Sequence, residues 1–269
     1  MALSPNINIM IKAAEKAGRS LVRDFGEVEQ LQVSRKGPGD FVSAADHRAE
    51  EIIFNELSRA RPDFGFIMEE RGKAGNPKAD SFFIVDPLDG TGNFLHGIPH
   101  WCVSIGLEEK GEVTAGIIYD PVRDETFRAE KGKGAFMKNK RLRVSGRTTM
   151  DSAMFATGQP SREKGRQELF MREYEAVLTH SLGIRRFGAA ALDLAYVAAG
   201  RFEGFWERGL KAWDMAAGYI IVKESGGIVT DIEGRKSPIH ESNVLAANTD
   251  LYDDLKKILN AAKQEKDAA

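Results

Sequence analysis

The stretch from Ser81 to Thr91 constrains the fold more than any other part of the chain. Residues 81–85 (Ser-Phe-Phe-Ile-Val) are mostly aromatic and β-branched, which is typical of a buried strand. We expect Asp86-Pro87 to end this strand, because proline fixes φ and has no N–H for the sheet ladder. Gly90 allows close backbone approach to a ligand, and Thr91 is placed to begin a short helix whose free N–H groups favour an anion.

Two carboxylates, Asp86 and Asp89, therefore follow a buried strand within one tight turn. Carboxylates this close repel each other unless a cation lies between them. Oxygen ligands on a turn suit Mg²⁺, which keeps waters and bridges to phosphate. The stretch favours a metal and phosphate site, and the alternative is a solvated turn, because Asp, Pro and Gly are common turn residues.

Composition limits the class of protein. At 269 residues, the chain could form one large domain over 1–269 or two closely packed halves, an α+β half at 1–145 and an α/β half at 146–269. A net charge of −2 gives no general reason to bind nucleic acid or anionic membranes. The single cysteine, Cys102, cannot form an intramolecular disulfide, which fits the cytoplasm. No apolar run reaches membrane-spanning length, and no signal peptide is recognisable.

The N-terminal part predicts two helices with a loop between them. Apolar residues at helical spacing indicate a helix from about Ser4 to Phe25, and a second from Asp46 to the residues before Pro62. Residues 33–40 contain two glycines, a proline and two cations, which indicates a mobile loop. From it Lys36 could reach a metal-bound water or a phosphate, although a solvated surface lysine is the simpler alternative.

The next segments predict a sheet. Residues 64–68 form a short strand followed by Glu69 and Glu70, whereas 71–80 resemble a surface loop. The segments after the central turn predict an antiparallel meander of strands at 101–107, 113–119, 125–129 and 135–137. Cys102 is expected to be a buried apolar side chain, and the histidines near the turn lack zinc-ligand spacing. From residue 154 onward strands alternate with helices, which is typical of an α/β unit.

Three acidic segments lie just past predicted strands or at the start of a helix, as a two-metal site requires. Residues 69–70 (Glu-Glu), 86–94 (Asp-Pro-Leu-Asp-Gly-Thr-Gly-Asn-Phe) and 213–218 (Trp-Asp-Met-Ala-Ala-Gly) resemble the inositol monophosphatase family in content, order and separation. The later 224–227 (Glu-Ser-Gly-Gly) matches as well. The resemblance extends from about Ile9 to Leu259 and is strongest to the bacterial SuhB-type members.

The resemblance implies a layered αβαβα sandwich and Mg²⁺-dependent hydrolysis of a phosphate monoester, with myo-inositol monophosphate as the first substrate. It also implies inhibition by lithium and a homodimer. The implied metal ligands are Glu69, Asp86, the Leu88 carbonyl, Asp89 and Asp214. Asp46 and Thr91 are implied to orient the attacking water, with Glu69 holding the metal that acidifies it. The phosphate is implied to lie on the N–H groups of Gly90 and Thr91.

The same resemblance places Gly188, Ala189, Ala190 and Glu207 around the sugar or inositol part of the substrate. Many relatives carry Ser or Thr where Ala189 stands, and Met68 replaces a glycine that is common before the acidic pair. Fructose 1,6-bisphosphate, an adenosine bisphosphate and histidinol phosphate are therefore alternative substrates. A different class of function is a SuhB-like factor that binds the transcription machinery, for which we expect Arg185-Arg186 to lie on an exposed turn.

Overall fold

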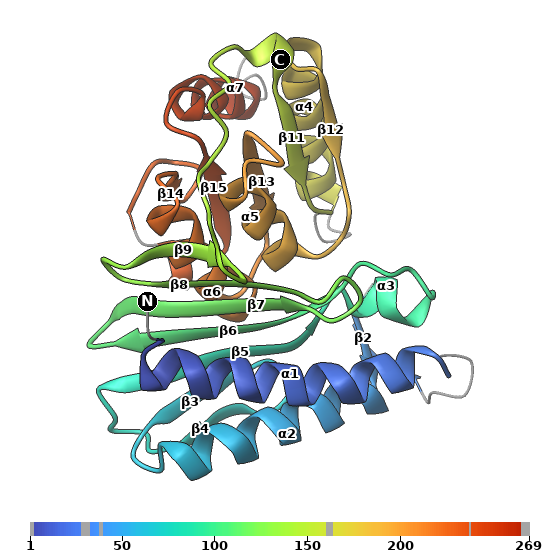
Figure 1. Cartoon of the computed structure of the whole chain (residues 1–269). Coiled ribbons are helices and arrows are strands. Elements are labelled where there is room, and N and C mark those ends of the chain that lie inside the picture. The colour runs from blue at the N-terminus through green and yellow to red at the C-terminus, as the bar shows by residue number, and fades with distance from the viewer. Residues whose placement is uncertain (1–2, 28–32, 38–39, 160–163, 237, 265–269) are drawn as a thin grey trace.

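The chain folds into five layers in the order αβαβα, as the family resemblance implies (Figure 1). The computed structural model describes residues 3–27, 33–37, 40–159, 164–236 and 238–264. Two sheets alternate with three helical layers: α1 (Pro5–Phe25) with α2 (Ala44–Ala60), α5 (Ala190–Ala198) with α6 (Ala212–Glu224), and α4 (Lys164–His180) with α7 (Tyr252–Gln264). The layers alternate because each apolar helix or sheet face must be buried against another element.

The larger sheet has eight strands in the order β10-β9-β8-β7-β6-β5-β3-β4. Strands β6 to β9 form the expected antiparallel meander, β5 and β10 extend it antiparallel at its two ends, and β3 adds to β5 in parallel. The bounds are β3 Gly65–Met68, β4 Gly72–Gly75, β5 Ser81–Asp89, β6 Cys102–Glu109, β7 Glu112–Asp120, β8 Glu125–Glu130, β9 Gly134–Met137 and β10 Lys140–Arg141.

The smaller sheet has five strands in the order β12-β11-β13-β15-β14. β11 is parallel to β12 and β13, whereas β15 runs antiparallel to β13 and β14. This half therefore contains the predicted alternation of strands and helices. The bounds are β11 Met154–Thr157, β12 Gly183–Arg185, β13 Gly204–Arg208, β14 Ile228–Thr230 and β15 Asn243–Ala247.

Three local predictions are wrong. β5 does not end at Asp86-Pro87, because its pairing with β6 shifts register between Asp86 and Asp89, and Pro87 falls in this irregular part. The loop expected at 71–80 contains β4, a short strand at the edge of the sheet. The loop expected at 33–40 contains β1 (Val33–Gly37), which pairs with β2 (Asp40–Ser43). Pro38 and Gly39 lie outside the described residues, as does the side chain of Lys36.

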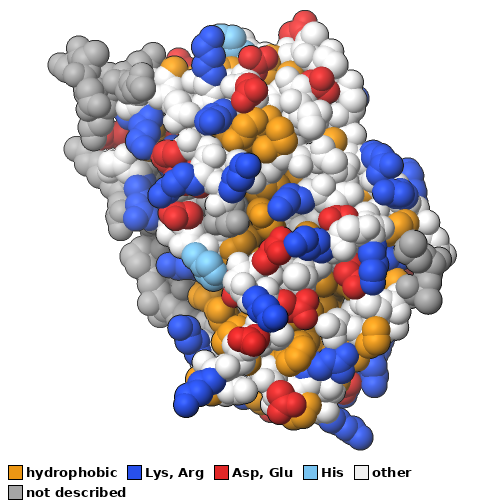
Figure 2. Space-filling model, turned by 90° about the vertical axis from the view of Figure 1, so that its left-hand side faces the viewer, with side chains coloured by type: hydrophobic (Ala, Val, Ile, Leu, Met, Phe, Trp, Pro, Cys, Tyr) orange, Lys and Arg blue, Asp and Glu red, His pale blue; other side chains and the backbone are white. Residues whose placement is uncertain are grey.

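Glycines on the larger sheet bring α6 close to it. A Cβ on Gly106 would lie 2.7 Å from the Ala216 Cβ, and one on Gly116 would lie 2.8 Å from the Ala217 Cα. The close approach fixes the start of α6, which carries Asp214, over the central strands. Acidic and basic side chains are mixed over the face shown in Figure 2. No helix among the described residues has the length and apolar character needed to cross a membrane.

Candidate metal and phosphate site

The turn after β5 forms the centre of the site. Asp86 is buried with 2% of its surface exposed, and its Oδ1 accepts a hydrogen bond of 2.9 Å from the Leu88 N–H. Gly90 has a φ of +93° and precedes α3 (Thr91–Leu95). A Cβ on Gly90 would lie 3.0 Å from the carbonyl oxygen of His100. Both the left-handed backbone and the close approach therefore favour glycine.

A second group of acids approaches this turn from α2 and the end of β3. Thr91 Oγ1 donates to the Leu88 carbonyl oxygen at 2.9 Å and lies 3.4 Å from Asp46 Oδ2. Asp46, Glu69 and Glu70 each offer a carboxylate oxygen within 4.8 Å of the others, an arrangement that could hold a metal ion. The family resemblance assigned only Glu69 of this adjacent pair as a ligand, so Glu70 is an addition from the structure.

The acids of the two groups act on one another electrostatically. Burial is the largest cause that raises the pKa of Asp86, followed by the negative charges of Glu69, Asp89, Asp214 and Asp46. The structure therefore brings together the five acidic residues singled out in the sequence. A cluster of buried and half-buried carboxylates fits a hard divalent cation, which would remove the repulsion between them.

The N-terminus of α5 supports Asp89. Asp89 Oδ2 accepts a hydrogen bond of 2.7 Å from the Ala191 N–H, while the N-cap residue Ala189 makes no side-chain cap. Burial and then Asp214 raise the pKa of Asp89 to about 7, although the Ala191 and Ala190 N–H groups lower it. The carboxylate of Asp89 thus replaces the missing cap of this helix.

The residues expected around the substrate meet the same turn. Asn93 Nδ2 donates to the carbonyl oxygens of Phe187 at 2.7 Å and His100 at 2.8 Å. A Cβ on Gly90 would lie 3.3 Å from that of Ala189. The segment of Gly188, Ala189 and Ala190 therefore lies against the turn that follows β5.

Glu207, the remaining expected substrate residue, lies on β13 and is half-buried. Burial raises its pKa, as do the charges of Asp193, Asp214 and Asp89 in that order, whereas Arg186 lowers it. Glu207 is thus electrostatically linked to the acidic cluster. Arg186 itself is exposed and donates to Gln159 Oε1 at 2.7 Å.

Asp193 was not identified from the sequence, although it is the one charged residue in the apolar helix α5. It is fully buried, and neither carboxylate oxygen has a hydrogen-bond partner within the described chain. Burial raises its pKa well above the usual value, and the charge of Asp89 adds to this. An acidic residue in an otherwise apolar helix is the signal that could have identified it.

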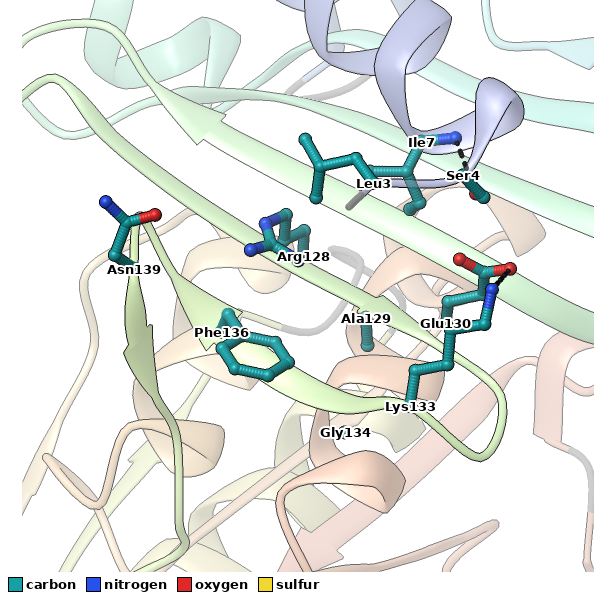
Figure 3. A pocket seen from close by; sticks show the side chains of 10 residues that line it. All are labelled: Leu3, Ser4, Ile7, Arg128, Ala129, Glu130, Lys133, Gly134, Phe136 and Asn139. Atoms are coloured by element: carbon teal, nitrogen blue, oxygen red, sulfur yellow. Dashed lines mark hydrogen bonds and ion pairs between the residues drawn. The ribbon is translucent and has the colours of Figure 1, made fainter. Parts of the chain in front are cut away.

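A hollow of about 260 Å³ lies elsewhere, between the start of α1 and the β8–β9 hairpin (Figure 3). Polar groups that line it already have partners there: Lys133 Nζ lies 2.6 Å from Glu130 Oε1, and the Ser4 hydroxyl accepts from the Ile7 N–H at 3.3 Å. It contains none of the acidic cluster, so we place the candidate site at the turn after β5.

Comparisons with known proteins show which sequences and structures this chain resembles. The model of the inositol monophosphatase family matches residues 2–267. An inositol-1-monophosphatase of Mesorhizobium japonicum is 54% identical over 92% of this chain and 93% of that protein. A Nus factor SuhB of Xylella fastidiosa is 45% identical over 87% of this chain and 84% of its own. The crystal structure of the extragenic suppressor protein suhB from Bartonella henselae superposes with a TM-score of 0.92 at 54% identity, covering 95% of this chain and 98% of that one.

Proposed function

Since the chain belongs to the inositol monophosphatase family, we propose that it is a Mg²⁺-dependent phosphatase that releases phosphate from myo-inositol monophosphate. The observation that carries this proposal is the cluster of Asp46, Glu69, Asp86, Asp89 and Asp214 around the turn after β5. Relatives at 48–54% identity are named inositol-1-monophosphatase, which supports the substrate class.

The proposed roles follow from the family and fit the residues present. Glu69, Asp86 and the Leu88 carbonyl would hold one metal ion, and Asp86, Asp89 and Asp214 a second. Bound divalent cations supply an acidified water and neutralise phosphoryl charge. Glu70 lies close enough to Asp46 and Glu69 to share in holding a cation.

The protein groups around the metal ligands would position the reactants. Thr91 Oγ1, within 3.4 Å of Asp46 Oδ2, is placed to give its proton to that carboxylate and to accept one from the attacking water. The N–H groups of Gly90 and Thr91 would orient the phosphate. Gly188, Ala189, Ala190 and Glu207 would contact the alcohol part of the substrate.

The test is Asp86→Asn and Asp214→Asn, each assayed for phosphate release with Mg²⁺. We expect a loss of about a thousandfold or more, because each change removes a charged ligand from the site. Circular dichroism should show that both variants stay folded. Asp250→Asn, on an exposed residue, is the matched control and should retain full activity. Wild-type turnover by either site variant would contradict the proposal.

Phosphate release from a panel of phosphate esters would identify the alcohol part of the preferred substrate. Ala189 offers no hydroxyl to the substrate, so selection for inositol must come from other contacts. We expect myo-inositol monophosphate to be hydrolysed faster than fructose 1,6-bisphosphate, an adenosine bisphosphate or histidinol phosphate. Lithium should inhibit, by analogy with the family. A higher kcat/KM for one of the other esters would show that this ester is the preferred substrate and would leave the proposed reaction, phosphate-ester hydrolysis, unchanged.

A second candidate function is binding to the transcription machinery, favoured by relatives at 38–45% identity that are named Nus factor SuhB, some of them provisionally. Arg185 and Arg186 are exposed, as expected, but Arg185 is the last residue of β12 and only Arg186 lies beyond the strand. Pull-down from cell extract, with wild type against Arg185→Ala/Arg186→Ala, should recover RNA polymerase or a factor bound to it only with wild type. Equal recovery would count against this function.

We also propose a cytoplasmic homodimer. Met171, Leu178 and Leu182 on or just after α4 are 60%, 46% and 64% exposed, an unusual degree for large apolar side chains. Light scattering should give twice the chain mass, and Leu178→Asp should reduce it. A monomeric wild type would rule out the dimer without affecting the proposed reaction.

A further inference from the structure

The carboxylate of Glu207 occupies space that most residues would fill at position 158. Gly158 directly follows β11, which pairs in parallel with β13 through Thr157 and Trp206. A Cβ on Gly158 would lie 1.8 Å from Glu207 Cδ, 1.9 Å from Oε1 and 2.0 Å from Oε2. Glu207 can therefore take its observed orientation only because residue 158 has no side chain.

Electrostatic interactions link this pair to the candidate site. Gln159, the residue after Gly158, accepts a hydrogen bond of 2.7 Å from Arg186, and Arg186 is the basic group that acts on Glu207. Thr157 Oγ1 donates to the Trp206 carbonyl oxygen at 2.8 Å and ties the two strands together just before Gly158 and Glu207. Glu207 also feels the charges of Asp214 and Asp89, which links it electrostatically to the acidic cluster.

We propose that Gly158 is a specificity-determining residue, which holds the Glu207 carboxylate where it accepts a hydroxyl of the substrate's alcohol part. This inference rests on the proposed function and on the role given there to Glu207. A carboxylate accepts hydrogen bonds from hydroxyl groups, so Glu207 held in this orientation favours polyol esters over esters that lack hydroxyls. Gly158 acts through Glu207 and touches no reacting atom.

The contacts of Gly158 allow its role in positioning Glu207 to be tested separately from a role in packing. The atoms in the way of a Cβ at position 158 are the flexible end of Glu207, so Gly158→Ala should displace the carboxylate and leave the strands in place. We expect KM for myo-inositol monophosphate to rise about tenfold, the usual effect of losing one hydrogen bond to a charged group. Hydrolysis of phenyl phosphate, which has no hydroxyl on its alcohol part, should stay within about twofold of wild type.

Two further variants complete the test. Gly146→Ala is the matched control, because a Cβ there meets nothing within 4 Å, and it should behave as wild type with both esters. In a Glu207→Ala background, Gly158→Ala should have no further effect, because the group through which it acts is gone. The double variant Gly158→Ala/Glu207→Ala lacks the carboxylate that would clash with the new Cβ, so it should fold even if Gly158→Ala alone does not.

The possible outcomes are distinct. An unchanged KM for myo-inositol monophosphate in Gly158→Ala overturns the inference. So does an equal loss with phenyl phosphate, or an additional loss in the Glu207→Ala background. A single variant that unfolds while the double variant folds would assign Gly158 to packing alone and also overturn it. If the wild-type protein releases no phosphate from either ester, the proposed function is wrong, and the inference is overturned with it.

Discussion

Asp193 is a single residue that differs from the apolar core around it, because it is a buried acid next to the candidate site. It is the charged member of α5, whose nine residues are all buried, and neither of its oxygens has a hydrogen-bond partner within the described residues. Burial raises its pKa, and Asp89 raises it further. The folded state therefore keeps a proton that the unfolded chain releases, so stability is lost as pH rises from about 4 through the raised pKa.

We expect Asp193→Asn to relieve this loss, since asparagine has a similar shape and no charge. Relative to wild type, the free energy of unfolding should increase by about 1–2 kcal/mol near pH 8 and change less near pH 5. Urea unfolding at the two pH values measures the difference, with the exposed Asp250→Asn as control. Equal destabilisation at both pH values would show that Asp193 supports the fold through contacts instead.

The acidic residues could be identified from the sequence because they lie in three motifs whose residues, order and separation can be recognised without a structure. In the structure they act on the buried Asp86 electrostatically, and Glu70 lies beside Asp46 and Glu69. The contact of Gly158 with Glu207 could not be predicted, because it depends on the pairing of two strands that lie almost fifty residues apart. Contacts of this kind leave no local pattern.

At the scale of elements, Glu224 explains a motif that the proposed chemistry does not use. Its two carboxylate oxygens accept hydrogen bonds from the N–H groups of Gly132 and Gly134, each at 2.8 Å. The end of α6 is thereby joined to the turn between β8 and β9. Since α6 also carries Asp214 at its other end, this link helps fix the helix that supplies the site.

Glu224→Ala should lower the free energy of unfolding by roughly 1–3 kcal/mol, because it leaves two backbone donors without their acceptor. Urea denaturation measures the loss. Glu112→Ala, which breaks a surface ion pair with Lys131, is the control and should lower the free energy of unfolding much less, because solvent screens an exposed pair. A loss no larger than that of the control would show that water replaces Glu224 at the turn.

The long helices were predictable because their apolar residues recur every three or four positions. α1 begins about where it was expected, and the Ser4 hydroxyl caps it by accepting a hydrogen bond from the Ile7 N–H. The short strands β1, β2 and β4 were missed, because glycine-rich and polar segments resemble loops until a partner strand is known. β5 was predicted to end at Asp86-Pro87 because proline usually stops a strand. A register shift between Asp86 and Asp89 instead lets Pro87 remain within β5.

At the scale of the whole molecule, the five layers bring distant parts of the chain to one point. The acids come from α2, the ends of β3 and β5, and the start of α6, which belong to different layers or different ends of the sequence. The layer order itself came from the family resemblance, because strand and helix patterns alone allow several ways of stacking two sheets. The fold must therefore tolerate several buried carboxylates at this one point.

This electrostatic cost should make the stability of the whole protein depend on pH and on metal. The pKa of Asp89 is raised to about 7, and that of Asp86 is raised as well, so protein treated with a chelator should lose thermal stability as pH rises from about 5 to 8. Mg²⁺ should raise Tm at both pH values, and more at the higher one, because only the deprotonated carboxylates bind it.

Thermal unfolding with EDTA or with excess MgCl₂ at each pH measures this dependence, and KCl at equal ionic strength controls for screening. At Mg²⁺ concentrations about a hundred times Kd, the stabilisation should be about 2.7 kcal/mol. Asp86→Asn/Asp214→Asn should show a smaller Mg²⁺ shift, because two ligands lose their charge. A Tm of the chelated protein that rises with pH would contradict the raised pKa values of Asp86 and Asp89. A Mg²⁺ shift of full size in the double variant would place the metal away from the acidic cluster.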